Sequence, residues 1–420
     1  MPFCIDREAS EPNSIRKDFH YLKAKLKKNT EAGAPTPVSK LKFWLSPIIF
    51  LVVFIGLMLL FALPMGLSNA LSTIMNTSFA LLIDTCLYIM AIAVIMGAVA
   101  ALLTEFGVVA LLNNLLNPLM KPLYGLPGAA ALGIVTTYLS DNPAILSLAE
   151  DSGFRKYFKK YQFYALTNLG TSFGMGVIVS TFMLGLNVAG GNLVTAVLVG
   201  NLGAVIGSIV STRIMLFQTK KIFGTEEYED AAPVIGGGAA VETKKAGIGM
   251  RVLNSALNGG KSGVEIGLAI IPGVVVVCTL VMLLTKGPSA DGTYTGAAFE
   301  GINLLPRAAE KINFLLQPLF GFASSESIAV PITALGSAGA ATGIVKELSA
   351  AGLVPAHDIA VFTAMCMCWS GYLSTHASMM QALRRPDMTG KAIISHTIGG
   401  LAAGFAANWL FKLVSLIFGA

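Results

Sequence analysis

The chain has 420 residues, of which 54% are hydrophobic and 12% are charged, and its mean hydropathy is +0.71. Soluble proteins usually carry about a quarter charged residues, so this composition excludes an ordinary soluble domain and indicates a polytopic membrane protein. The net charge of +6 does not indicate a nucleic-acid partner, because basic residues of membrane proteins gather in cytoplasmic loops.

Residues 1–42 are predicted to form a cytoplasmic arm, because nine lysines and arginines precede the first apolar run. Downstream, seven stretches reach the roughly 20 residues that a membrane-spanning helix needs. These stretches are 43–66, 79–103, 163–186, 193–217, 264–284, 359–383 and 392–418. The distribution of basic residues also places the polar linker 219–262 in the cytoplasm. We therefore expect a multi-pass protein of the bacterial cytoplasmic membrane, surrounded by lipid.

Two apolar regions, 126–150 and 322–349, are punctuated by glycine, proline, serine and asparagine. The distribution of basic residues shows no conflict if each region enters and leaves the membrane on the same side. Irregular backbone at membrane depth is tolerated only where protein or water satisfies it. We predict two re-entrant helical hairpins, the first entering from the cytoplasm and the second from outside. The turn of the second hairpin is expected in "GSAGAATG", residues 336–343.

The two halves of the chain repeat short motifs in the same order. The matching pairs are 121–125 with 317–321 at an offset of 196, Gly203 and Gly207 with Gly400 and Gly404 at 197, and Thr171-Ser172 with Trp369-Ser370 at about 198. Because the two hairpins enter from opposite sides, the halves are predicted to be inverted repeats. Such repeats are typical of secondary transporters.

The predicted fold class is an all-α polytopic membrane protein with inverted repeats, about seven transmembrane helices and two opposed re-entrant hairpins. The predicted segments are a cytoplasmic basic arm (1–42), a first transmembrane helix with an external loop (43–78), a first repeat (79–218), a cytoplasmic linker (219–262) and a second, inverted repeat (263–420).

Polar residues interrupt both hairpins. The turn of the first hairpin is "SDNP", in which Ser140, Asp141 and Asn142 precede Pro143. An ionisable residue inside a membrane is a functional candidate, so we assign Asp141 to ion coupling and its two neighbours to substrate binding. The alternative is an ordinary capped turn.

The second hairpin contributes a parallel set of polar candidates. Ser325 and Ser337 are assigned to substrate binding, and Glu326 to ion coupling. Helix capping is the alternative interpretation for the serine and glutamate pair.

The spans that follow the hairpins are also interrupted, in "TNLGTSFGMG" (167–176) and "CWSGYLSTH" (368–376). Glycines next to hydroxyl residues are places where a helix unwinds and presents its carbonyl groups to a ligand. The substrate-binding candidates there are Asn168, Thr171, Ser172, Trp369, Ser370 and Ser374. His376 is an ion-coupling candidate because histidine titrates near neutral pH. Close packing of small residues between helices is the alternative.

Other kinds of site are not expected. Cys366 and Cys368 stand in an apolar setting without a companion set of ligands, so packing is favoured over metal binding. Phosphate-binding loops, nucleophile elbows and zinc-protease helices are absent from the sequence. We expect neither a catalytic residue nor a cofactor, and only Na⁺ or H⁺ as a coupling ion.

Several stretches resemble the Gate, or nucleoside-recognition, membrane domain family. The resemblance lies in "VVALLNNLLNPLMKPLYGLPGAAALGI" and from "GLAIIPGVVVVCTLVMLL" to "LLQPLFGFASSES", and covers most of 79–218 and 263–420. This family resembles the core of concentrative nucleoside transporters. The resemblance implies that solute and ion bind at Asp141, Asn142, Thr171, Ser172, Ser325, Glu326, Ser370 and Ser374. An Asn/Gln-rich hairpin that would read a nucleobase is missing, so the resemblance implies a fold more than a solute.

The function predicted from these features is cation-coupled secondary transport of a small polar or organic solute. A core of two hairpins and two broken helices would alternate its access between the two faces. The alternative from another class is a scaffold or signalling module that acts through the linker. The large apolar surface is also compatible with a homodimer.

Overall fold

The computed structural model describes residues 37–142, 144–150, 152–188, 191–228, 247–289 and 291–418. This part of the chain is helical apart from turns and one isolated β-bridge between Lys159 and Tyr228. It divides into two units, residues 1–63 and 64–420. Most of the predicted basic arm, Pro143 and residues 229–246 of the predicted linker lie outside the described residues. The predicted all-α fold is confirmed.

Among the residues that the structure describes, five segments are long and apolar enough to cross a membrane. They are Leu45–Met65, Leu67–Glu105, Leu193–Phe223, Ile248–Thr285 and Pro386–Phe418. Large apolar side chains such as Leu202 and Phe405 are exposed on them, which is expected where the surrounding solvent is lipid. The protein is a multi-pass membrane protein.

The first unit holds most of α2 (Pro37–Met65). The elements of the second unit up to residue 223 are α3 (Leu67–Ala80), most of which precedes the predicted first repeat (79–218), and then η1 (Leu81–Cys86), α4 (Leu87–Glu105), α5 (Val108–Leu119), η2 (Met120–Tyr124), α6 (Ala130–Leu139), α7 (Ala144–Glu150), α8 (Ser152–Arg155), α9 (Lys160–Phe163), α10 (Leu166–Thr171), α11 (Gly176–Leu184) and α12 (Leu193–Phe223). The external loop predicted at 67–78 is wrong, because α3 is helical throughout. That stretch lacks charge, but it also lacks proline and internal glycine, so nothing in it ends a helix.

The second repeat contains α13 (Ile248–Pro272), η3 (Gly273–Cys278), α14 (Thr279–Thr285), α15 (Leu304–Lys311), α16 (Asn313–Phe320), η4 (Ser325–Ile328), α17 (Ala329–Ala334), α18 (Ala338–Ala350), α19 (Ala356–Trp369), α20 (Tyr372–Ala382), η5 (Pro386–Met388) and α21 (Thr389–Phe418). Helix α18 begins earlier than predicted, because Ser337 caps it by accepting a hydrogen bond from Ala340 N. The turn is therefore residues 335–337, and the rest of "GSAGAATG" is helical.

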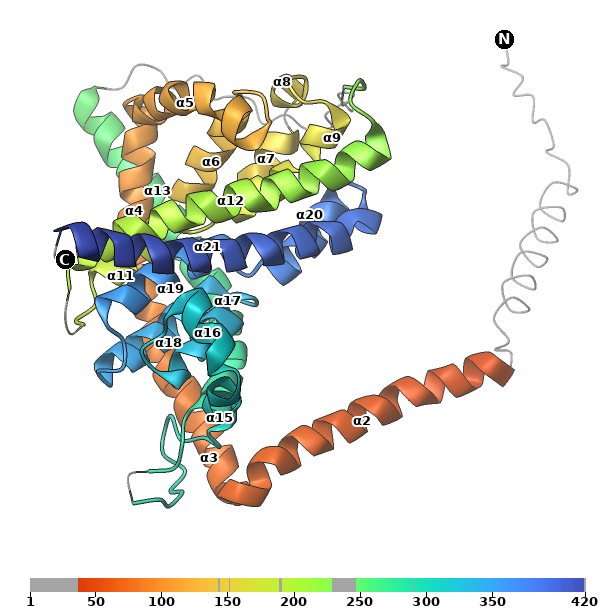
Figure 1. Ribbon diagram of the computed structural model, residues 1–420, viewed down its shortest axis with the longest axis vertical. Coiled ribbons are helices and arrows are strands. Elements are labelled where there is room, and N and C mark those ends of the chain that lie inside the picture. The colour runs from red at the N-terminus through yellow and green to blue at the C-terminus, as the bar shows by residue number, and fades with distance from the viewer. Residues whose placement is uncertain are drawn as a thin grey trace, which may run out of the picture. The chain divides into compact units, whose positions relative to one another are not determined.

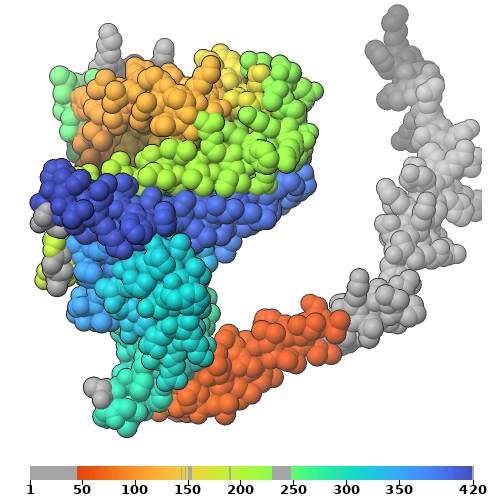
Figure 2. Space-filling view, viewed as in Figure 1, coloured from red at the N-terminus to blue at the C-terminus, as the bar shows by residue number. Residues whose placement is uncertain are grey.

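Helices α12 and α21 lie side by side through the middle of the second unit (Figure 1). Small residues permit this approach, since a Cβ atom on Gly207 would meet Ala403 and the backbone of Gly399. In Figure 1, helices α5 to α9 lie on one side of this pair and α15 to α18 on the other. Figure 2 shows the same order on the surface, with first-repeat residues in orange and second-repeat residues in cyan separated by the two long helices.

The offset of 196 recurs in the backbone. Gly125 and Gly321 both end a helix in the left-handed conformation, with φ of 71° and 67°. The last helix of each repeat then bonds the carbonyl groups exposed just before that glycine. Arg213 of α12 donates to Pro122 O at 2.6 Å, and Trp409 of α21 donates to Pro318 O at 3.2 Å.

The broken helices correspond at the same offset. Met175 and Gly371 both stand in the left-handed conformation immediately before α11 and α20, with φ of 56° and 68°. The predicted pairing of Thr171-Ser172 with Trp369-Ser370 at about 198 is therefore shifted by two residues. The shift arises because the left-handed residues, and not the hydroxyl residues, mark where each helix breaks.

Candidate solute and ion site

The break between α19 and α20 is the point at which the two repeats meet. Helix α19 ends at Trp369, and the left-handed Gly371 turns the chain into α20. A turn of this kind interrupts the pattern of helical hydrogen bonds, so carbonyl and N–H groups near it need partners from elsewhere. We call residues 368–371 the junction.

The turn of the first hairpin supplies one of these partners. Asn142 is 3% exposed, and its Nδ2 donates to Ser370 O at 2.7 Å. Its Oδ1 is buried without a hydrogen-bond partner among the described residues. The approach depends on Gly174 in the other broken helix, because a Cβ atom there would collide with the Asn142 amide and lie 2.9 Å from Ser370 Oγ. The first hairpin and both broken helices therefore converge at the junction.

The second hairpin reaches the junction from its own repeat. Gly371 N donates to Ala334 O at 2.9 Å, at the end of α17. A Cβ atom on Gly371 would lie 2.9 Å from Gly336 O, so only glycine lets the hairpin turn approach this closely. The turns of both hairpins thus end on two consecutive residues, Ser370 and Gly371.

Helix α21 completes the junction with a buried chain of hydrogen bonds. His396 places Nε2 against Cys368 O and Nδ1 2.9 Å from Ser211 Oγ. Asn168 Nδ2 donates to the same serine oxygen at 3.0 Å and to Ala392 O at 3.0 Å. Because a carbonyl oxygen only accepts, His396 carries its proton on Nε2 and accepts from Ser211. The chain fixes the side of the junction that faces α12 and α21.

Aromatic and imidazole rings line the same region. Trp369 and Tyr372 stack with centroids 6.1 Å apart, and the His376 and His396 rings lie 4.7 Å apart. His376 Nδ1 bonds Tyr372 O at 3.0 Å, whereas its Nε2 is buried without a partner among the described residues. Trp369 Nε1 is also buried and has no hydrogen-bond partner among the described residues. Unsatisfied buried polar atoms are costly and mark positions where a ligand could bind.

This geometry can be compared with known proteins. Residues 86–187 match the Gate family, which is described as nucleoside recognition. The resemblance predicted from the sequence is confirmed over this range, which we call the Gate region. The Gate region contains the first hairpin, Asn142, and the first broken helix with Asn168 and Thr171.

The chain is also similar to solved structures of CNTnw, a concentrative nucleoside transporter. The inward-facing, substrate-bound state is 13% identical over 80% of this chain and 76% of that chain, with a TM-score of 0.48. An intermediate state of a variant is 14% identical over 76% and 75%, with a TM-score of 0.49. An outward-facing state of a double variant is 12% identical over 78% and 76%, with a TM-score of 0.47. No curated protein matches the sequence.

Several predicted site residues lie at or beside the junction. The junction itself contains Trp369 and Ser370. It is contacted by Asn142, which bonds Ser370 O, and lies beside the His376 ring, which packs against Tyr372 and His396. Asn168 reaches it through Ser211 and His396. Asp141 lies beside them in the hairpin turn, where its Oδ1 accepts from Asn142 N at 2.7 Å. This contact orients the asparagine that reaches across to Ser370.

Four predicted hydroxyl residues bond their own helices instead. Ser140 donates to Thr136 O, Thr171 to Thr167 O, Ser172 to Asn168 O and Ser374 to Gly371 O. Ser337 caps α18, next to the hairpin turn that reaches Gly371. These contacts satisfy local backbone groups, which is the ordinary role of such residues in helices.

Ser325 and Glu326 lie elsewhere, at the base of the second hairpin. Ser325 Oγ lies 3.4 Å from Glu326 Oε2, and Ser325 lines a small cavity with Glu310 and Asn313. Neither residue has a recorded contact with the junction. The buried carboxylate of this region is Asp358, 0% exposed, which was not among the predicted candidates.

Sequence reasoning also missed Ser211, His396 and Asn408. Each stands in a long apolar helix without glycine or proline beside it, so no local signal separates it from a packing residue. Polar side chains within apolar spans are rare and functional by default, and that rule applied to every histidine and asparagine would have found His396 and Asn408, but not Ser211. Cys366 and Cys368 are buried and free, and the described residues contain no cluster of three metal-ligating side chains.

Proposed function

We propose that the protein is a cation-coupled secondary transporter that carries a small polar or organic solute through the junction. The observation that carries this proposal is the convergence of both hairpin turns on Ser370 and Gly371. Each turn is held there mainly by one recorded hydrogen bond, which contributes about 1 kcal/mol net. Alternating access would require one hairpin turn to leave the junction while the other stays in place.

The buried unpaired atoms around the junction support a solute with hydrogen-bonding groups and a flat ring. Asn142 Oδ1 is an acceptor and Trp369 Nε1 a donor without a partner among the described residues, and both lie near the buried, stacked rings of Trp369 and Tyr372. Nucleosides carry both features, and the Gate region bears the description nucleoside recognition. Nucleosides are therefore the first class of solute to test.

The test is uptake by the purified, full-length protein in liposomes. Radiolabelled uridine and adenosine, an amino-acid mixture and an organic-acid mixture are offered under an inward Na⁺ gradient, an inward H⁺ gradient or no gradient. We expect gradient-dependent accumulation of at least one class, and we expect Asn142→Ala to abolish it. A protein that accumulates none of these classes under either gradient contradicts the proposal.

Deletion of the linker distinguishes a transporter from a scaffold protein that acts through its linker. Deletion of residues 229–246 should leave uptake unchanged in a transporter, because the described helices α12 and α13 end and begin outside that segment. The N-terminus and this linker are proposed to face the cytoplasm, as the distribution of basic residues indicates.

A further inference from the structure

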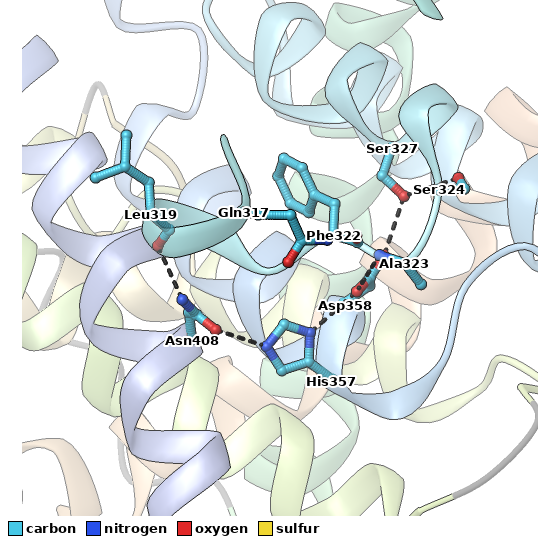
Figure 3. A network of polar contacts seen from close by, with 9 residues as sticks. All are labelled: Gln317, Leu319, Phe322, Ala323, Ser324, Ser327, His357, Asp358 and Asn408. Carbon is cyan, nitrogen blue, oxygen red and sulfur yellow. Dashed lines mark hydrogen bonds and ion pairs between the residues drawn. The ribbon is translucent and has the colours of Figure 1, made fainter. Parts of the chain in front are cut away.

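A buried polar network fastens the base of the second hairpin to two helices (Figure 3). Asp358, at the start of α19, accepts hydrogen bonds from Ala323 N at 3.1 Å and Ser327 Oγ at 3.0 Å. His357 lies between this carboxylate and α21, with Nδ1 3.0 Å from Asp358 Oδ1 and Nε2 2.9 Å from Asn408 Oδ1. Three parts of the second repeat therefore meet on one ion pair.

The Asn408 amide determines where the hydrogen atoms of His357 lie. Asn408 Nδ2 donates to Pro318 O at 3.3 Å and Leu319 O at 3.1 Å, and carbonyl oxygens can only accept. The amide oxygen, and not the nitrogen, consequently faces His357. The Nε2 atom of His357 must therefore carry a proton and donate it.

The same reasoning at the other ring nitrogen requires a second proton. A neutral imidazole that is protonated on Nε2 has a lone pair on Nδ1. That lone pair would point at an ionised carboxylate oxygen 3.0 Å away, which is repulsive. The contact becomes attractive only when one additional proton is bound, either on His357 Nδ1 or on the Asp358 carboxyl.

We propose that the His357–Asp358 pair is a proton-binding site, and that the bound proton fastens Asp358, which holds the hairpin base at residues 323 and 327, to His357 and through it to α21. The Asp358 side chain is 0% exposed, whereas that of His357 is 16% exposed, so the histidine gives the proton a route to the surface. In the proposed transporter this proton is the coupling ion, a role that rests on the proposed function.

Four groups from neighbouring elements contact the pair, and none of them is an ion. From the hairpin base come the Ala323 N–H and the Ser327 hydroxyl, and from α21 come the Asn408 amide and the Phe411 ring. All four groups are neutral. Protonation is therefore decided within the pair.

Ionisable side chains on the neighbouring elements are directed elsewhere. Glu326 of η4 accepts from Ser325, and Lys412 of α21 lies over the Trp409 ring. Glu310 of α15 lines the cavity beside the hairpin base. None of the three has a recorded contact with His357 or Asp358.

The first repeat shows that an ion pair is not needed to hold this kind of turn. Around Gly125, which corresponds to Gly321, the neutral Gln162 Nε2 donates to Gly125 O at 3.0 Å. The second repeat instead places His357 Cε1 3.0 Å from where a Cβ atom of Gly321 would lie. The His357–Asp358 pair thus stands where the first repeat uses the Gln162 amide together with the Arg213 guanidinium, which donates to Leu123 O and Pro122 O.

The proton is tested directly on the purified, full-length protein in nanodiscs. Nitrogen NMR of ¹⁵N-histidine-labelled protein, with the signal assigned by its loss in His357→Gln, reports the protonation of His357. Infrared spectra that compare wild type with Asp358→Asn report a protonated carboxyl. We expect one of the two residues to hold the extra proton near neutral pH. A His357 that is neutral beside an ionised Asp358 throughout the pH range in which the protein is folded would overturn the proposal.

Hydrogen exchange of residues 323–328 tests what the proton does. In wild type, protection of this segment should fall once the pair has lost its proton, after correction for intrinsic exchange, because the His357 lone pair then repels the carboxylate that holds the segment. His357→Gln and Asp358→Asn should show no such pH-dependent loss, while Asp387→Asn, which removes the carboxylate of an exposed ion pair with Arg385, should behave like wild type. Identical pH profiles in all four proteins contradict the proposal. Melting temperatures and gel-filtration profiles identify any variant that fails to fold.

Uptake in liposomes separates this inference from the proposed function. Solute accumulation driven by a pH gradient in wild type, but lost in Asp358→Asn while solute exchange without a gradient persists, supports proton coupling at this pair. Accumulation that responds only to Na⁺ overturns the coupling role and leaves the transporter standing. A protein that moves no solute overturns the proposed function, and the spectra and exchange data then still decide the proton site.

Discussion

Asn142, in the turn of the first hairpin, donates a hydrogen bond to the main-chain oxygen of Ser370, 228 residues further along the chain. The bond joins the two repeats at the residue where α19 has ended and α20 has not begun. The acceptor is a backbone oxygen, so the bond needs no particular side chain on the second repeat. It needs the interruption between α19 and α20, which leaves this oxygen free to accept. One side chain therefore ties the first hairpin to the break in the second broken helix.

Replacement of Asn142 by alanine should uncouple the first hairpin from the junction. The Ser370 carbonyl would lose a buried partner, at a cost of about 1–3 kcal/mol, and the melting temperature should fall accordingly. Uptake should be lost. Asn76→Ala is the matched control, because Asn76 also donates to a carbonyl, Gly296 O at 2.8 Å, but away from the junction. Equal uptake by the two variants would argue against a functional junction.

Gly371→Ala should disturb the second hairpin more than an ordinary glycine substitution in a helix would. The left-handed φ of 68° costs a non-glycine residue about 1–2 kcal/mol, and the added Cβ atom would press on Gly336 O at 2.9 Å. Thermal denaturation of the purified protein measures this loss. Gly390→Ala serves as the control, since a Cβ atom there meets nothing within 4 Å. A stability loss no larger than that of the control would contradict the close packing described for the hairpin turn.

The corresponding glycines of the two repeats should differ in their tolerance of alanine. Gly125→Ala and Gly321→Ala both force a left-handed residue, which costs about 1–2 kcal/mol. At Gly321 the Cβ atom would also lie 2.7 Å from Asn408 Oδ1, whereas at Gly125 the nearest atom is a flexible Arg213 nitrogen at 3.1 Å. Gly321→Ala should therefore lower the melting temperature more. A larger loss of melting temperature in Gly125→Ala would show that Asn408 and His357 can move aside for the added Cβ atom.

Glu300 should make the loop between α14 and α15 sensitive to acid. Burial raises the pKa of its carboxyl, but the hydrogen bonds it accepts from Ser289 and from residues 295–296 lower it more, so the pKa lies below its ordinary value. A depressed pKa adds stability above the pKa of the unfolded chain, and that stability disappears as pH falls through the folded pKa.

Hydrogen exchange of residues 286–303 measures this effect. Protection should fall on acidification in wild type, whereas Glu300→Gln should show weaker protection that no longer depends on acid. Asp291→Asn is a control for a neighbouring carboxylate, because Asp291 bonds only within its own turn, to Thr293. Acid sensitivity that persists in Glu300→Gln would place its origin in another group.

Much of the fold could be predicted from the sequence. Long apolar runs imply membrane-spanning helices regardless of tertiary context, because lipid leaves a backbone no other way to satisfy its hydrogen bonds. The glycine and hydroxyl clusters marked both broken helices, whereas the matched glycines of "KPLYG" and "QPLFG" were read only as a repeat and are two left-handed helix ends in the structure. The uncharged segment 67–78 was mistaken for a loop, since lack of charge is compatible with either structure.

Only the tertiary structure decided which polar residues meet. The sequence placed Asn142, Ser370 and His376 among the candidates, but it gave equal standing to Ser325 and Glu326, which lie at the hairpin base away from the junction. It passed over His357, Asp358 and Asn408, because each is alone in its own segment and acquires meaning only from partners on other helices. Helix periodicity and turn chemistry are local and can be read along a chain, whereas a proton shared between two side chains depends on which atoms the packing of distant helices brings within 3 Å.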